Sequence, residues 1–187
     1  MNRKSLLPVV LVPTCILSIP AAAMLFRVEG WAWSIADFIV FWGLIAGVLL
    51  TYKLMTRKAV SGYYRVAAAL ALATGLLLIW VNGAVGLIGS EDNPANVLYG
   101  GVLLVGVFGA VMARLEPLGL AMTLYATALA QFLVPMVALV VWPNDFSPGV
   151  GLVFALNGFF ALGFAVAGVL FKYAERMQNQ NGMGAAA

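Results

Sequence analysis

The sequence predicts an all-α integral membrane protein, a bundle of six transmembrane helices with both termini in the cytoplasm. Three observations lead to this fold class. Of the 187 residues, 64% are hydrophobic and only 9% are charged, whereas charged residues make up about a quarter of an ordinary soluble domain. The apolar residues form runs of about twenty residues, which is the length that crosses a bilayer. Nine of the ten basic residues lie in alternate gaps between these runs.

The basic residues also give the predicted orientation, because short loops rich in Lys and Arg stay on the cytoplasmic side during insertion. The inner gaps and ends hold Arg3, Lys4, Lys53, Arg57, Lys58, Arg65, Arg114, Lys172 and Arg176. The outer gaps hold one cation and four acids, namely Arg27, Glu29, Glu91, Asp92 and Asp145. Since the cations form no basic patch beyond these membrane-flanking loops, the net charge of +3 does not indicate a nucleic-acid partner.

The predicted spans, in chain order, are 6–26, 34–53, 66–89, 95–113, 118–141 and 149–171. Residues 1–177 are therefore predicted to form a single transmembrane helical domain. The polar and then small residues of 178–187 predict a disordered tail. The first run follows two cations and contains three alanines near its end, which resemble the cleavage site of a secretory signal, but its length favours an uncleaved helix.

Residues at the span boundaries support these limits. Ser34 and Asp37 have the spacing of a capping box at the start of the second span. Asn93-Pro94 and Ser147-Pro148 are typical of an N-cap followed by the first helical residue. Aromatic residues fall at the predicted membrane surfaces, where amphipathic rings prefer to lie, and Tyr99 is one of those at the outer surface.

The composition argues against an enzyme. The chain has no His, the commonest general base and metal ligand, and its one Cys, Cys15, lies inside an apolar run. No nucleophile–base pair or cluster of carboxylates is apparent. We therefore predict no catalytic residue, no metal site and no cofactor.

Polar residues within the spans are the first place to look for function in a membrane protein. The candidate polar pocket consists of Asp37, Asn82, Gln131 and Asn157. The three amides share helix faces with small residues and lie at similar depths, so they should point into the outer half of the bundle. They form either a polar pocket or ordinary interhelical hydrogen bonds. Asp37 either caps its helix or handles an ion or proton.

Three further groups of residues have two interpretations each. The outer-loop residues Glu91, Asp92, Asn93 and Asn96 could contact a cation or partner, or form a tight turn that caps the next helix. The small residues Gly43, Gly47, Gly106, Gly109, Ala110 and Ala113 form faces for packing within the chain or against another chain. The cations Lys53, Arg57, Lys58 and Arg65 set the topology, or bind anionic lipid heads as well.

One part of the sequence resembles uncharacterised small polytopic bacterial inner-membrane proteins. The resemblance rests on Trp80-Val81-Asn82-Gly83, Gly89-Ser90-Glu91-Asp92-Asn93-Pro94-Ala95-Asn96 and Leu98-Tyr99-Gly100, and covers spans two to six. It implies a bacterial cytoplasmic membrane and no particular activity.

Two functions are expected. The first is an accessory, structural or assembly subunit that forms a homo-oligomer or joins other membrane subunits in the lipid bilayer. The alternative is a small-solute or ion transporter or channel that uses the outer-half polar pocket.

Overall fold

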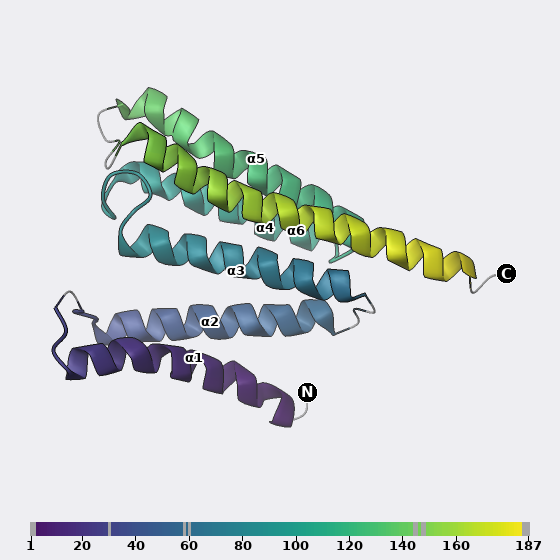
Figure 1. The fold of residues 1–187 in the computed structure, drawn as a ribbon, viewed down its shortest axis with the longest axis horizontal. Helices are drawn as coiled ribbons and strands as arrows, with labels where there is room; N and C mark the ends of the chain where they lie inside the picture. Colours follow the sequence, from purple (N-terminus) through teal and green to yellow (C-terminus); the bar gives the residue numbers. More distant parts are fainter. Residues whose placement is uncertain are drawn as a thin grey trace. The chain divides into compact units, whose positions relative to one another are not determined.

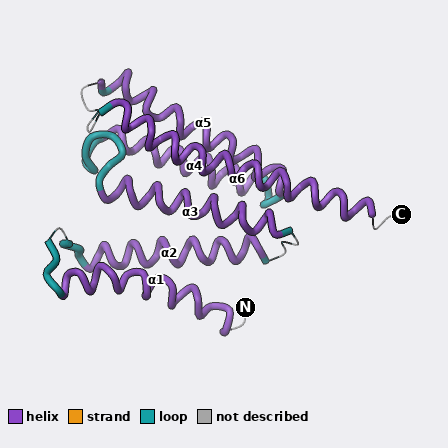
Figure 2. Tube along the Cα trace, viewed as in Figure 1, coloured by secondary structure: helices purple, strands orange, loops and turns teal. Residues whose placement is uncertain are grey.

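The computed structural model describes residues 3–29, 31–57, 59, 61–143, 146 and 149–184. These residues form helices and loops, and no strand occurs among them (Figure 2). The helices are α1 (Arg3–Leu25), α2 (Ile35–Thr56), α3 (Gly62–Ala84), η1 (Pro94–Val97), α4 (Leu98–Met112), α5 (Pro117–Val141) and α6 (Val150–Gly184). In this described part of the chain, six helical segments are long and apolar enough to cross a membrane. The all-helical fold class, with six helices of sufficient length and hydropathy to span a membrane, is thus confirmed for the described residues.

The chain divides into two compact units, residues 1–54 and residues 55–187. In the first unit, the Trp42 indole Nε1 of α2 donates a hydrogen bond of 3.2 Å to the Thr14 Oγ1 of α1. Trp33 stacks on both Trp31 and Phe41 near the start of α2, with ring centroids 6.3 and 5.0 Å apart. The prediction of one transmembrane domain over 1–177 stays a prediction.

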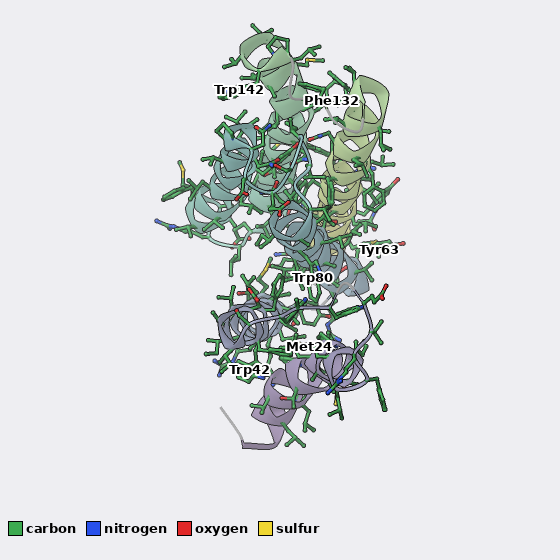
Figure 3. All side chains as sticks on the ribbon, turned by 90° about the vertical axis from the view of Figure 1, so that its left-hand side faces the viewer. Met24, Trp42, Tyr63, Trp80, Phe132 and Trp142 are labelled. Carbon is green, nitrogen blue, oxygen red and sulfur yellow. The ribbon has the colours of Figure 1, made fainter. Side chains whose placement is uncertain are left out.

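The second unit is an antiparallel arrangement of α3, α4, α5 and α6 (Figure 1). Helix α6 packs against both α3 and α5, and α5 also packs against α4. Outward-pointing side chains are predominantly carbon (Figure 3), and large apolar residues such as Phe108 and Phe159 are exposed. Because soluble monomers rarely expose continuous apolar surface, this pattern is typical of a protein surrounded by lipid.

Glycines set the close approach of helices in the second unit. A β-carbon added at Gly163 of α6 would lie 2.8 Å from the Thr74 hydroxyl oxygen of α3. At Gly168 of α6 it would lie 2.9 Å from the Tyr125 ring of α5. The absence of a side chain at these positions lets the neighbouring backbones come near each other, as is usual in membrane bundles.

The structure corrects two of the predicted boundaries. Helix α3 ends at Ala84 rather than at 89, because the chain turns at Gly86 and Gly89, which both have a φ of +70°. Helix α6 continues to Gly184, so the structure has helix over 178–184 where a disordered tail was expected. Asn179 there donates a 3.2 Å hydrogen bond to the Glu175 carboxylate one turn earlier, a contact that stabilises exposed helix. Residues 185–187 lie outside the described residues.

Two of the predicted caps are confirmed. The Ser34 amide and hydroxyl donate to the Asp37 Oδ2 at 2.7 and 2.8 Å, and the Asp37 amide donates back to the Ser34 hydroxyl at 3.2 Å. The Asn93 side chain accepts from the Ala95 amide at 2.9 Å and caps η1, which leads directly into α4. The predicted cap at Ser147-Pro148 lies outside the described residues.

Candidate functional site

Two of the four predicted pocket residues meet in the core between α4, α5 and α6. The Gln131 amide nitrogen of α5 donates to the Asn157 Oδ1 of α6 at 2.9 Å. The Asn157 Nδ2 donates to the Tyr99 hydroxyl of α4 at 3.0 Å and to the Val153 carbonyl at 2.8 Å. Gln131 and Asn157 have an exposed fraction of 0%, and Tyr99 of 1%. We call Tyr99, Gln131 and Asn157 the amide cluster.

The sequence positions these side chains through small neighbours and helical spacing. On α5, Thr127 and Gln131 lie one turn apart and are both buried. Thr127 lies near Gly106 of α4, and Gln131 is bonded to Asn157 of α6. A β-carbon added at Gly106 of α4 would lie 3.5 Å from the Thr127 hydroxyl oxygen. This is an ordinary van der Waals distance, so α4 and α5 are in normal contact at this level.

The amide cluster is only partly satisfied. The Gln131 Oε1 is buried and has no hydrogen-bond partner among the residues that the structure describes. A buried acceptor without a donor destabilises the folded protein by about 1–3 kcal/mol. The low dielectric of the surroundings is the reason that an unpaired polar group is so costly there.

Tyr99 is the member of the cluster that sequence reasoning assigned differently. It was predicted to lie at the outer membrane surface, but its ring is in the core and its hydroxyl accepts from Asn157. A tyrosine near the end of an apolar run fits either environment. The signal that could have identified it is its position three residues after Asn96, since η1 leads directly into α4 and both residues are buried.

Asn82 does not join the amide cluster. It is half-buried, and its Nδ2 donates to the Asn96 main-chain carbonyl at 3.3 Å. Its Oδ1 is buried and has no hydrogen-bond partner within the described ranges. Asn82 therefore ties the end of α3 to η1, as an interhelical contact would.

Asn96 organises the loop between α3 and α4, which was predicted to lie on the outer side. Its Oδ1 accepts from the amides of Leu87 and Ile88 at 3.2 and 3.1 Å. Its Nδ2 donates to the carbonyls of Ile88 and Ser90 at 3.1 and 2.6 Å. Gly86 closes this turn, since a β-carbon there would collide with the Ser90 carbonyl. Asn96 thus acts as an internal brace and is buried.

The other outer-loop candidates divide in the same way. Asn93 is used as the cap of η1, whereas Glu91 and Asp92 are exposed at the tip of the loop. The geometry agrees with the tight capping turn for Asn93 and Asn96. The hydrogen bonds of Asn93 and Asn96 stay within the loop, η1 and the adjoining end of α3.

Asp37 lies in the first unit and completes the capping box with Ser34 described above. The Asp37 Oδ2 accepts from the Ser34 amide and hydroxyl, and the Ser34 hydroxyl oxygen accepts from the Asp37 amide. This reciprocal capping is a sufficient structural reason for an acid at this position. The geometry favours the capping interpretation over ion handling.

The predicted packing faces behave differently on the two helices. On α4, a β-carbon added at Gly109 would lie 2.5 Å from the Thr123 Cγ2 of α5, and Ala113 lies against Gly119. The face of Gly106, Gly109, Ala110 and Ala113 is therefore a seam within the chain. On α2, Gly43 and Gly47 are exposed, and a β-carbon at either would meet nothing within 4 Å among the described residues.

The basic residues of the second loop also differ in their environment. The Lys53 Nζ of the first unit is buried without a hydrogen-bond partner among the described residues. In the second unit Arg57 is exposed, and the Arg65 guanidinium donates to the Ala59 carbonyl at 3.1 Å. Lys58 lies outside the described residues. Binding of anionic lipid by these cations stays a prediction.

The structure also shows a contact that the sequence did not suggest. The Tyr64 hydroxyl of α3 donates to the Leu115 carbonyl in the α4–α5 turn at 2.9 Å. Arg114 and Leu115 in this turn have φ values of 49° and 62°, which are costly for residues with a side chain. Tyr64 thus contacts the α4–α5 turn where its backbone is strained.

Among the described residues, no group of three or more His, Cys, Asp or Glu side chains could hold a metal ion. No protein-family model, curated protein or solved structure matches the chain. The resemblance to small bacterial inner-membrane proteins stays a prediction.

Proposed function

We propose that this chain is a non-catalytic, multi-spanning protein of a bacterial cytoplasmic membrane that serves as an accessory, structural or assembly subunit of a larger membrane complex. The observation that carries the proposal is the use of its polar side chains. Asp37 caps a helix, Asn82 and Asn96 brace a loop, and Gln131 and Asn157 bond to each other. Polar side chains that hold helices together by hydrogen bonds are typical of a structural protein.

The loop lengths support the same proposal. The loops between consecutive helices are too short to fold into a soluble domain, so contacts with other proteins would be made mainly inside the bilayer. Helix α4 packs mainly against α5, and it exposes Leu104, Val107, Phe108 and Val111. Such an exposed apolar surface is covered by lipid or by another subunit.

Photo-cross-linking in native membranes tests the proposal. A benzophenone amino acid is placed at one exposed position on each helix of the second unit, namely Leu77, Phe108, Leu129 and Phe159. A subunit gives a discrete protein adduct at one or more positions. The same adduct partner should co-purify at fixed stoichiometry in mild detergent. Lipid adducts alone at all four positions, with a protein that purifies by itself, contradict the proposal.

A transporter or channel is the second candidate, and the unpartnered Oε1 of Gln131 and Oδ1 of Asn82 favour it. Two acceptors in the outer half of a bundle could contact a passing solute. The test is flux of small ions and neutral solutes into liposomes that contain the purified protein. Flux that falls in a folded Gln131→Met variant supports this candidate, and equal flux in protein-free liposomes contradicts it.

A further inference from the structure

Gln131 has two carbonyl oxygens whose usual donors are missing. Its side-chain Oε1 is buried without a partner among the described residues. Its main-chain carbonyl precedes Pro135 by four residues within α5, and proline has no N–H to complete the helical hydrogen bond. Both residues are fully buried. Two acceptors of one residue therefore lie in the core without the donors expected for them.

Tyr99 supplies the complementary group. Its hydroxyl oxygen accepts from the Asn157 Nδ2 at 3.0 Å, so its own hydrogen points away from that bond. The structure shows no acceptor for this hydrogen within the part of the chain that it describes. The Asn157 amide joins Tyr99 on one side to Gln131 on the other. An unused donor and an unused acceptor thus flank the same buried amide.

We propose that the amide cluster binds one buried water molecule, which accepts from the Tyr99 hydroxyl and donates to the Gln131 Oε1. The second hydrogen of the water then serves the main-chain carbonyl of Gln131. Buried waters in proteins make about two to four hydrogen bonds of this kind. In membrane helices, ordered waters commonly satisfy the carbonyl that a proline has freed.

The chemistry of the cluster favours water over a metal cation. Tyr99, Gln131 and Asn157 are neutral, and no carboxylate belongs to the cluster. A cation buried there would be without a counter-charge, which is costly in the membrane interior. Water supplies the donor that Gln131 lacks and the acceptor that Tyr99 lacks without adding charge. The water site goes beyond the proposed function and does not depend on it.

Solid-state NMR of the intact protein in lipid bilayers tests the site by measuring magnetisation transfer from water to side-chain amides. The chain has only three glutamines, Gln131, Gln178 and Gln180, and the last two are exposed near the end of α6. They serve as hydrated controls, and the buried backbone amides of Ala67 and Ala68 serve as dry controls. A Gln131→Met variant assigns the Gln131 signal.

We expect the Gln131 side-chain amide to receive magnetisation from water several-fold faster than Ala67 and Ala68. Transfer no faster than at Ala67 and Ala68 overturns the proposal. In a folded Tyr99→Phe variant, which lacks the hydroxyl donor, transfer to Gln131 should fall at least two-fold. Unchanged transfer in that variant overturns the assigned role of Tyr99.

A second measurement distinguishes a bound water from a bound cation. The Tm of the wild-type protein in detergent is compared in sodium, potassium and choline chloride at equal ionic strength. Because a water site has no preference among these salts, we expect equal values. A Tm that rises with one small cation and is lost in the Gln131→Met variant overturns the water and assigns a cation instead.

Discussion

Asn96 shows how much one side chain can contribute in this protein. Within the described residues, its amide makes four hydrogen bonds, all to main-chain groups of the preceding loop. These bonds let Leu87 and Ile88 leave the helix and still be buried, with exposed fractions of 2% and 0%. This part of the loop is buried, so water does not replace these bonds. Without Asn96, its amides would lack an acceptor and its carbonyls would lack a donor.

Replacing Asn96 by Ala should therefore destabilise the protein strongly. Because the substitution leaves several buried main-chain groups unsatisfied, we expect a loss of about 2–4 kcal/mol in the free energy of unfolding. The matched control is Asn179→Ala, which removes an exposed amide with one hydrogen bond and should cost less than about 0.5 kcal/mol. Unfolding of both variants is measured in the same lipid–detergent mixture. Similar losses in the two variants would show that Asn96 is not the brace of the loop.

At the level of elements, a seam of small residues holds α4 against α5, and other positions on α4 are exposed. Gly109 faces Thr123 of α5 so closely that no side chain fits, whereas Gly101 on the same helix has nothing within 4 Å among the described residues. The two glycines are matched in helix and chemistry and differ only in what they face. Comparing substitutions at the two positions therefore separates the effect of helix packing on stability from the effect of helix propensity.

Alanine substitutions at these two positions should have opposite effects. Gly109→Ala forces α4 and α5 apart and should cost about 1–3 kcal/mol of unfolding free energy. Gly101→Ala removes the flexibility of glycine without a clash and should stabilise by about 0.5–1 kcal/mol. The measurement is the Tm or the unfolding free energy of each variant in detergent. A Gly109→Ala variant as stable as Gly101→Ala would mean that the seam is loose.

Apolar run length predicted the existence of all six helices, but it could not predict where α3 ends. Leu87 and Ile88 are apolar and continue the run, although they belong to a loop that is buried by Asn96. The loop satisfies its backbone through a side chain rather than through helix, and hydropathy does not contain that information. Only the pair Gly86 and Gly89, both with positive φ, marks the turn in the sequence.

The sequence predicted which residues belong to the candidate site better than it predicted which of them bond to each other. Helical spacing placed Gln131 and Asn157 on inward faces, and they do meet. Their third partner, Tyr99, is 58 residues from Asn157 in the chain, and no periodicity within one helix can indicate such a pairing. Asn82 has a similar depth and small neighbours, yet it bonds to η1 because the loop at 85–93 brings Asn96 next to it.

For the whole molecule, the distribution of charge predicts on which side of the membrane each loop lies. The exposed acids Glu91 and Asp92 lie in the α3–α4 loop, and the exposed cation Arg57 follows α2. Basic loops stay in the cytoplasm during insertion, so consecutive loops should alternate between the two sides of the membrane. Both termini are then expected in the cytoplasm.

Cysteine labelling tests this topology directly, because the chain has a single native cysteine, Cys15. In a Cys15→Ser background, a cysteine replaces Glu91 or Arg57, and intact cells are treated with a membrane-impermeant maleimide. We expect Glu91→Cys to be labelled in intact cells and Arg57→Cys only after permeabilisation. The reverse labelling pattern would mean that the protein has the opposite orientation in the membrane. Labelling of both from the same side would mean that α3 does not cross the bilayer, because α3 is the one helix that separates these two loops.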